Sequence, residues 1–290
     1  MNDLSFVENT MQYFVVKMSI EAVAPPSNLS KLAPYFCCFS SPIFVCFVGE
    51  LANSEGSVFK KALLPLLVMF TAVTDAQAAS SYATYPPAGS RTVDDVMKRY
   101  SPFVEPRIKR YFESVGLTYP PKNIALFAMK EEMSLELWAE EKGKWSYVKR
   151  YDIEKISGKK GPKLREGDKQ VPEGIYRVSL LNPNSRFHLS MKLDYPNAFD
   201  RKYARLEGRT SPGSNIFIHG KQASTGCLAM GDYSIEELFL LAERTGLDNI
   251  EVVISPRDPK KGKLTAALNQ PFLTQILYRN IEQEARKFGR

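Results

Sequence analysis

Two side chains in the C-terminal half of the chain could carry out nucleophilic chemistry. His219 ends the apolar run Ile216–Ile218, and Cys227 lies eight residues further on, after a loop of small and polar residues. A thiol is a strong nucleophile only as the thiolate, and a neighbouring imidazole can accept its proton. We therefore predict that Cys227 is the nucleophile and His219 its base, brought together by a hairpin-like return of the chain.

The loop between these two residues is suited to holding a reacting carbonyl group. Gly220 and Gly226 have no Cβ, so the backbone can approach a substrate closely at both positions. The amides of Gly226 and Cys227 are candidates to stabilise an oxyanion, with Ser224 in the same set, and the Gly220 carbonyl or a neighbour is a candidate to orient the imidazole. A structural histidine or an inert buried cysteine explains either residue alone, but explains the joint pattern less well.

Residues 60–79 have the composition of a secretory signal. Two lysines precede the apolar run Ala62–Phe70, and Ala76-Gln77-Ala78 is a small-residue pattern that predicts cleavage after Ala78. A buried or membrane-spanning helix is the weaker alternative, because about a dozen apolar residues cannot cross a bilayer core that needs ~20. The exported chain is therefore expected to have no stable membrane insertion and to reach the periplasm.

The position of this signal bears on the start of the chain. Export signals act at an N-terminus, so we expect residues 58–78 to be the signal peptide, with Val58 as a GTG start, and residues 1–57 to be a non-native or disordered extension. A second hypothesis retains residues 1–57 and places a membrane segment near Ile43–Val48.

Cleavage would leave Cys227 as the only cysteine of the exported chain, because Cys37, Cys38 and Cys46 lie upstream. A single cysteine in an oxidising compartment cannot form an internal disulfide, which favours a reactive thiol.

The chain has 39 Lys and Arg against 32 Asp and Glu, a formal net charge of +7. This balance suits an anionic partner such as cell-wall peptide, lipopolysaccharide or a membrane surface, or it simply keeps the surface soluble. Nucleic acid is not expected, since no helix-turn-helix, zinc-finger or aromatic RNA-binding signature is present.

The rest of the sequence predicts a mainly β fold with flanking helices, of the α+β class. In the segment 79–122, Thr92 and Asp95 predict a capped helix start, and Pro102 and Pro106 are expected to divide the segment into two helices. From Asn123 the apolar period changes to that of short strands. The runs 124–129, 134–139 and 145–148 predict a β-meander, and further strands are expected at 174–180, 187–193, 216–218 and 250–255.

The remaining segments are predicted as loops and helices. Residues 159–170 and 200–215 are expected to be loops. Ser234 and Glu237 fit a capping box that starts a helix ending at Gly246, and residues 257–290 are expected to dock an amphipathic helix.

The spacing His219-Gly220 … Ser224-x-Gly226-Cys227 after a strand resembles the catalytic motif of YkuD-type L,D-transpeptidases. The blocks 171–176, 182–188 and 195–198 are similar to the YafK-like branch of that family. The resemblance extends from about Asn123 to Ile254, so we assign residues 123–256 to a YkuD-like catalytic domain, a β-sandwich or barrel.

The resemblance implies a periplasmic, cysteine-dependent L,D-transpeptidase that acts on peptidoglycan stem peptides containing meso-diaminopimelate. Cys227 would form a thioester acyl-enzyme, and His219 would protonate the leaving amine. An amine acceptor gives transpeptidation and water gives hydrolysis. Two alternatives remain open: an amidase that releases an outer-membrane lipoprotein from the diaminopimelate of peptidoglycan, and a non-catalytic cell-wall-binding module. No cofactor is expected.

Two positions depart from the pattern of the cross-linking members of the family. Those members usually have His before the Gly-Cys pair and Arg two residues after the Cys, whereas this chain has Thr225 and Ala229. Without the arginine, the site lacks a planar donor that can hold a carboxylate with two hydrogen bonds. Lys221 or Arg205 could replace it, although Lys221 equally suits a solvated surface.

The residues predicted to contact substrate are His188, Tyr195, Lys221 and Thr225. A metal site formed by His219, Cys227, His188 and Asp232 is the remaining alternative, but its spacing matches no standard zinc motif. We therefore predict no metal.

Overall fold

The computed structural model describes residues 85–289, which all belong to one compact unit. The predicted extension 1–57, the signal at 58–78 and the alternative membrane segment at Ile43–Val48 lie outside the described residues, so they stay predictions. Within the described part of the chain, no helix is long and apolar enough to span a membrane.

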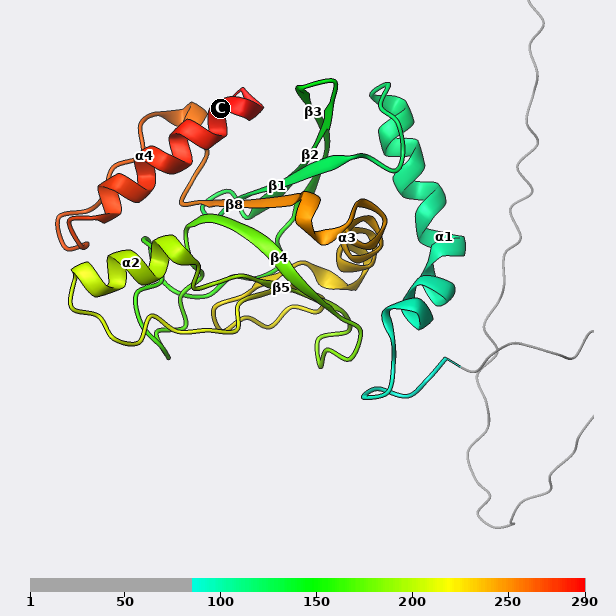
Figure 1. The fold of residues 1–290 in the computed structure, drawn as a ribbon, viewed down its shortest axis with the longest axis horizontal. Helices are drawn as coiled ribbons and strands as arrows, with labels where there is room; N and C mark the ends of the chain where they lie inside the picture. Colours follow the sequence, from blue (N-terminus) through cyan, green and yellow to red (C-terminus); the bar gives the residue numbers. More distant parts are fainter. Residues whose placement is uncertain (1–84, 290) are drawn as a thin grey trace, which may run out of the picture. The chain divides into compact units, whose positions relative to one another are not determined.

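One curled, mixed sheet of eight strands forms a half-barrel at the centre of the domain (Figure 1). The strand order is β3-β2-β1-β8-β4-β5-β6-β7. The pairs β1–β8 and β6–β7 are parallel, and the other pairs are antiparallel. In chain order, the strands are Asn123–Met129 (β1), Ser134–Glu141 (β2), Lys144–Asp152 (β3), Gly174–Asn182 (β4), Ser190–Leu193 (β5), Phe217–His219 (β6), Leu228–Ala229 (β7) and Ile250–Ser255 (β8). The predicted meander and the mainly β fold with flanking helices are confirmed.

Strand β4 joins the two halves of this sheet. Its first residues, Gly174–Arg177, pair with β8, whereas its later residues pair with β5 after a register shift between Val178 and Leu180. The sheet therefore bends at β4. Beyond this bend, β5, β6 and β7 form the part of the sheet that carries His219 and leads from Cys227.

Strand β1 is apolar at nearly every position because both of its faces are buried. The even-numbered residues of β1 belong to a core cluster shared with α1 and α3. The odd-numbered residues Ala125, Phe127 and Met129 belong to a second cluster shared with α4. A strand that is covered on both faces reads as a continuous apolar run.

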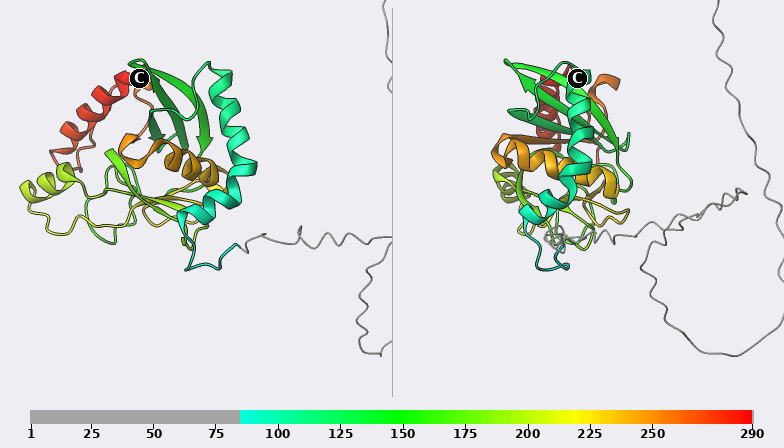
Figure 2. Two further views of the ribbon diagram at one scale, coloured as in Figure 1. Left: turned by 45° about the vertical axis from the view of Figure 1, so that its right-hand side comes forward. Right: turned by 90° about the vertical axis from the view of Figure 1, so that its right-hand side faces the viewer.

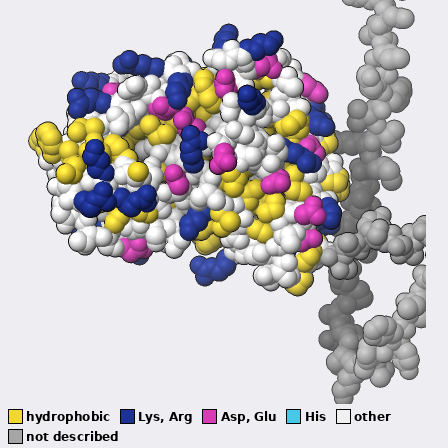
Figure 3. Space-filling model, viewed as in Figure 1, with side chains coloured by type: hydrophobic (Ala, Val, Ile, Leu, Met, Phe, Trp, Pro, Cys, Tyr) yellow, Lys and Arg dark blue, Asp and Glu magenta, His cyan; other side chains and the backbone are white. Residues whose placement is uncertain are grey.

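Four α-helices surround the sheet, and Figures 1 and 2 show α1 and α3 on one side of it and α4 on the other. Their bounds are Val93–Ser114 (α1), Ala198–Leu206 (α2), Gly231–Thr245 (α3) and Thr274–Ala285 (α4), with short 3₁₀ turns at Leu247–Asn249, Pro259–Lys261 and Arg286–Phe288. On the face drawn in Figure 3, Lys and Arg side chains are spread over the domain, and above α2 and the start of α4 they lie beside exposed hydrophobic side chains.

Helix α1 is continuous, so the prediction that Pro102 and Pro106 divide it into two helices is wrong. Both prolines are exposed, whereas Val104 and Ile108 on the same helix are buried. The backbone hydrogen bonds lost at the prolines therefore fall on the solvent side, where water can satisfy the freed carbonyl groups. The predicted start is confirmed, because the Thr92 amide donates to the Asp95 carboxylate at 2.8 Å.

Helix α2, Ala198–Leu206, overlaps the segment 200–215 that was predicted to be a loop. The Asn197 side chain accepts a hydrogen bond from the Asp200 amide at 3.1 Å, and the Asp200 carboxylate accepts one from the Asn197 amide at 3.0 Å. These reciprocal bonds form a capping box, which satisfies amides at the helix start that have no partner within the helix. The loop prediction is therefore wrong for residues 200–206.

Helix α3 begins at Gly231, so the predicted capping box at Ser234 and Glu237 is also wrong. The Glu237 carboxylate is fully buried and lies 3.0 Å from Arg107 Nε of α1 and 2.9 Å from Lys149 Nζ of β3. The Tyr111 hydroxyl also donates to it, at 3.3 Å. Glu237 therefore links α3 to α1 and to β3.

Candidate active site

His219 is held by contacts in the plane of its ring and on its face. It ends β6 with 2% of its surface exposed, and its Nδ1 lies 2.6 Å from the carbonyl oxygen of Gly220. A carbonyl oxygen only accepts hydrogen bonds, so Nδ1 carries the proton and Nε2 keeps its lone pair. The Phe187 ring stacks on the imidazole at 4.5 Å between centroids. This contact fits the orienting role expected of the Gly220 carbonyl, which stays a prediction.

Cys227 immediately precedes β7, which pairs with β6 in parallel. Ile218 is aligned with Leu228, and His219 with Ala229. The predicted hairpin-like return is therefore wrong, because the loop carries the chain back so that the two strands run in the same direction. Side chains alternate between the faces of a strand, so His219 and Ala229 lie on one face, and Cys227 comes two residues before Ala229, just outside β7.

The thiol of Cys227 is partly exposed and donates a long hydrogen bond to the Asn215 carbonyl oxygen at 4.0 Å. Burial raises its pKa above the usual value, although a backbone hydrogen bond from Phe217 and the charge of Lys163 act against this. Burial lowers the pKa of His219, which the contact with Gly220 partly offsets. Both groups are therefore neutral at rest near pH 7. If Cys227 is the nucleophile, as predicted, its thiolate would have to form by proton transfer to a base, the role predicted for His219.

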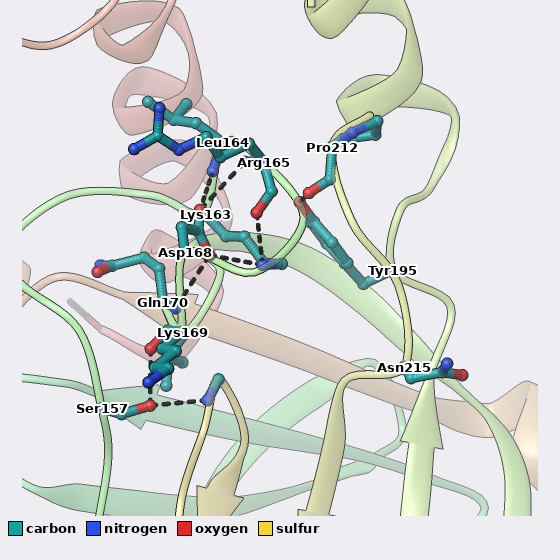
Figure 4. Close-up of polar contacts among 12 residues, drawn as sticks. Ser157, Lys163, Leu164, Arg165, Asp168, Lys169, Gln170, Tyr195, Pro212 and Asn215 are labelled. Carbon is teal, nitrogen blue, oxygen red and sulfur yellow. Dashed lines mark hydrogen bonds and ion pairs between the residues drawn. The ribbon is translucent and has the colours of Figure 1, made fainter. Parts of the chain in front are cut away.

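Ser157 fixes the loop in front of Cys227, although the sequence analysis did not single it out. The Gly226 amide donates to Ser157 Oγ at 2.7 Å, and Ser157 Oγ donates to the Lys169 carbonyl oxygen at 2.7 Å (Figure 4). The amide of Gly226, which we predicted as an oxyanion donor, is thus already bound within the protein. Ser224 Oγ donates to the Cys227 carbonyl oxygen at 2.7 Å, which fits an orienting role.

The two loop glycines are required for different reasons. Gly226 has φ +113°, a conformation that other residues rarely adopt. A Cβ at Gly220 would lie 2.7 Å from the Phe187 carbonyl oxygen and 2.6 Å from Asp232 Oδ1. The same Asp232 oxygen accepts a hydrogen bond from the Lys221 amide at 2.8 Å. The first turn of α3 therefore holds the chain directly after His219.

Two of the four predicted substrate contacts have their polar groups bound within the protein. His188 Nε2 lies 2.9 Å from Glu236 Oε1, and its ring packs edge-on against Tyr100. Tyr195 is 4% exposed, and its hydroxyl donates to the Pro212 carbonyl oxygen at 2.7 Å. These contacts favour a structural role for both residues.

The other two predicted substrate contacts, Lys221 and Thr225, are exposed. The Lys221 amine donates to the Arg186 carbonyl oxygen at 3.0 Å. Both remain predictions as substrate contacts. Among residues 85–289, no group of three or more His, Cys, Asp and Glu side chains is arranged to hold a metal ion.

Residues 127–254 match the family model described as the YkuD L,D-transpeptidase catalytic domain. The chain is therefore similar to this family over residues 127–254. The matched segment runs from β1 to β8 and includes both His219 and Cys227. YafK of Escherichia coli K12, whose name gives L,D-transpeptidase as a provisional activity, is 35% identical over 141 residues, or 47% of this chain and 54% of YafK. The O157:H7 protein of the same name gives the same values. The chain thus spans about half the length of the curated relatives it matches.

Solved structures with partial similarity include two bacterial proteins. Pgp2 of Campylobacter jejuni, described as a helical cell shape determining protein, has a TM-score of 0.39 and 21% identity, covering 52% of this chain and 56% of Pgp2. Bd1075 of Bdellovibrio bacteriovorus has a TM-score of 0.36 and 20% identity, covering 59% of this chain and 57% of Bd1075. Similarity at this level carries no argument about function.

The segment that matches this family model has no room for an arginine at position 229. Ala229 is fully buried in β7, and its backbone bonds on one side to Lys155 and Glu154 while its strand pairs with β6 on the other. An arginine side chain at this position, as in the cross-linking members, is therefore not compatible with the packing of β7.

Proposed function

We propose that this protein is a cysteine-dependent L,D-transpeptidase of the periplasm that acts on peptidoglycan stem peptides containing meso-diaminopimelate. The observation that carries the proposal is the state of His219. Its Nδ1 is bound to the Gly220 carbonyl oxygen and its Nε2 is left as a base. It ends β6, which pairs with β7, and the partly exposed Cys227 directly precedes β7. The match of residues 127–254 to the L,D-transpeptidase domain supports the choice of reaction.

In the proposed reaction, His219 Nε2 takes the proton from Cys227 as the sulfur attacks the amide carbonyl next to diaminopimelate. The Gly220 carbonyl oxygen stabilises the imidazolium that forms. An oxyanion then collapses as His219 returns the proton to the leaving amine, and a thioester remains. An acceptor amine attacks the thioester, gives its proton to His219 and restores the thiol.

A second candidate is an amidase that releases a lipoprotein from peptidoglycan diaminopimelate. The buried Ala229 favours this alternative, because the arginine usual in cross-linking members is missing. In that reaction, water replaces the acceptor amine in the second step. A third candidate, a wall-binding module without activity, would not need an accessible thiol.

The deciding experiment incubates the purified protein with tetrapeptide muropeptides and, separately, with lipoprotein-linked sacculi. New cross-links, detected by mass spectrometry, support the transpeptidase, and released lipoprotein supports the amidase. Cys227→Ala should abolish either product. If wild-type protein forms neither product and iodoacetamide does not modify Cys227 while wall binding persists, the binding-module alternative replaces both enzymes.

A further inference from the structure

A groove of about 1030 Å³ lies between residues 157–170 and residues 208–211. Its lining residues include five basic ones, Lys159, Lys160, Arg165, Lys169 and Arg209, and one acidic one, Asp168. We propose that this groove binds an acidic segment of the peptide substrate and that Lys159, Arg165 and Lys169 contact its carboxylates. The inference rests on the proposed function only for the identity of the peptide.

The negative charge of the acidic side chain in the groove, Asp168, is already compensated by partners within the protein. Asp168 lies 2.5 Å from Lys163 Nζ and accepts hydrogen bonds from the amides of Leu164, Arg165 and Gln170. Burial acts to raise the pKa of Asp168, but the bond from Lys163 and these amides hold it below the usual value. Asp168 therefore stays ionised and is unavailable to pair with the basic residues at the groove surface.

Three of the five basic side chains are free to meet a ligand. Lys160 pairs with Glu131, and Arg209 pairs with Glu207. By contrast, the exposed side chains of Lys159, Arg165 and Lys169 make no hydrogen bond or ion pair with any residue between 85 and 289. The groove thus presents three uncompensated positive charges.

The groove adjoins the residue that precedes the nucleophile. Ser157 and Gln170 both line it, and Ser157 Oγ accepts the hydrogen bond from the Gly226 amide at 2.7 Å. The Gln170 carbonyl oxygen lies 3.3 Å from the position that a Cβ on Gly226 would occupy. Figure 4 shows Ser157, Lys169 and Gln170 on one side and Asn215 on the other, with the pair of Lys163 and Asp168 above them. A peptide in the groove can therefore extend to Cys227.

The loop that carries Lys159, Arg165 and Lys169 is held in place by hydrogen bonds from buried side chains. The buried Lys130 amine donates to the carbonyl oxygens of Gly161 at 2.9 Å and Val171 at 3.0 Å, and lies 2.8 Å from Glu173. The Gln170 side chain accepts from the Lys159 amide at 2.6 Å and donates to the Lys159 carbonyl oxygen at 2.5 Å. Because the backbone is ordered before binding, the ligand loses less of its binding energy to loop ordering.

The chemistry of the groove points to a peptide with more than one free carboxylate. Ammonium and guanidinium groups bind carboxylates by charge-assisted hydrogen bonds. Such an array also compensates for the missing arginine at position 229, which is buried alanine here. Polyphosphates and anionic lipid surfaces carry negative charge as well, so the test must separate them from the acidic peptide.

The test compares two triple variants in a Cys227→Ala background, so that binding is measured without turnover. The groove variant carries Lys159→Gln, Arg165→Gln and Lys169→Gln. The control carries Arg110→Gln, Lys122→Gln and Lys144→Gln, which are also exposed, lie outside the groove and give the same change in net charge. The probe is a fluorescent synthetic stem tetrapeptide with free carboxylates, with its fully amidated form as the uncharged comparison.

We expect the groove variant to bind the acidic peptide about tenfold more weakly than the control at low salt, since exposed ion pairs each contribute up to about 1 kcal/mol. Added salt should reduce this difference. Equal affinities for the two triple variants, or equal affinities for the acidic and amidated peptides, would overturn the inference. So would tighter binding of polyphosphate or of anionic vesicles with the same dependence on the groove residues.

The outcome is separable from the proposed function. Charge-dependent peptide binding with no turnover by the wild-type protein would support the groove and reject the enzyme. Turnover of stem peptides without any effect of the groove variant would support the enzyme and reject the groove.

Discussion

The Nδ1 atom of His219 lies 2.6 Å from the carbonyl oxygen of Gly220, the next residue in the chain. This contact places the ring proton on Nδ1 and leaves Nε2 as the basic nitrogen. It requires no third side chain, because the backbone of the following glycine provides the acceptor. A side chain at position 220 would collide with Phe187 and Asp232, so the acceptor and the close packing depend on the same glycine.

The resting state of the pair can be tested by alkylation. Burial raises the pKa of Cys227 and lowers that of His219, so neither group is charged near neutral pH. The rate of iodoacetamide modification should therefore rise with pH to a midpoint above the ordinary thiol value of about 8.5. His219→Ala should leave this midpoint almost unchanged and reduce turnover by about 10²–10⁴-fold. A reactive plateau at pH 5–6 that disappears in His219→Ala would instead indicate a preformed ion pair, contrary to this expectation.

The pH profile of turnover should show the effect of burial on His219. The imidazole must be neutral to accept the thiol proton, and burial lowers its pKa from the ordinary value of about 6.5. Activity should therefore persist below pH 6.5 and fall only as the pH drops through the lowered pKa. Steady-state kcat/KM measured between pH 4 and pH 9 checks this. An acidic limb centred above pH 7 would show that the imidazole is stabilised in its charged form.

Lys163 and Asp168 should shift the pKa of the Cys227 thiol in opposite directions. The Lys163 charge acts to lower the pKa of Cys227, and Asp168 offsets part of that charge by pairing with Lys163. We expect Lys163→Met to raise the alkylation midpoint of Cys227 and Asp168→Asn to lower it. Lys163→Arg retains the charge and serves as the control. Shifts of the same sign in Lys163→Met and Asp168→Asn would rule out this electrostatic account.

Ser157 should matter for turnover more than for stability. Its hydroxyl joins the Gly226 amide to the Lys169 carbonyl oxygen, so Ser157→Ala releases the loop before Cys227 from the segment that carries Lys169. We expect the free energy of unfolding to fall by about 1 kcal/mol and kcat to fall by about tenfold or more, since misplacement of a nucleophile is costly. Ser146→Ala, on β3, is the matched control. Unchanged kcat in Ser157→Ala would mean that the loop holds its shape without this contact.

The elements that were predicted correctly have causes within a few residues of sequence. The run Ile124–Met129 is apolar at every position because β1 is covered on both faces. Thr92 and Asp95 start α1 through bonds that span three residues. The motif around His219 and Cys227, whose catalytic role stays a prediction, is equally local. Such features are visible without knowledge of the tertiary structure.

The features that were missed depend on distant partners or on a choice between two local signals. Ser157 contacts Gly226, which is 69 residues away, and its own loop has no hydrophobic period that would mark it. The parallel direction of β7 depends on the sheet edge that β6 offers, which the loop sequence does not specify. Asn197 and Asp200 have the residue types and spacing of a capping box. This signal was missed because it follows a turn and precedes a polar segment, and both favour a loop. Glu237 matched a capping box locally, yet tertiary ion pairs determine its place.

Replacing the buried Glu237 should destabilise the domain without directly affecting the site. Its carboxylate compensates Arg107 of α1 and Lys149 of β3, so Glu237→Gln leaves two partly buried cations without their anion. Loss of one partner from a buried ion pair costs about 3 kcal/mol. Urea unfolding followed by circular dichroism should show this decrease, whereas Glu113→Gln, an exposed substitution on α1, should change stability by less than about 0.5 kcal/mol. The alkylation midpoint of Cys227 should be the same in both variants below the unfolding transition, because Glu237 contacts α1 and β3 and has no contact with the loop that carries the thiol. Equal stability of the two variants would mean that the hydrophobic contacts between α1 and α3 hold these elements together without the ion pairs.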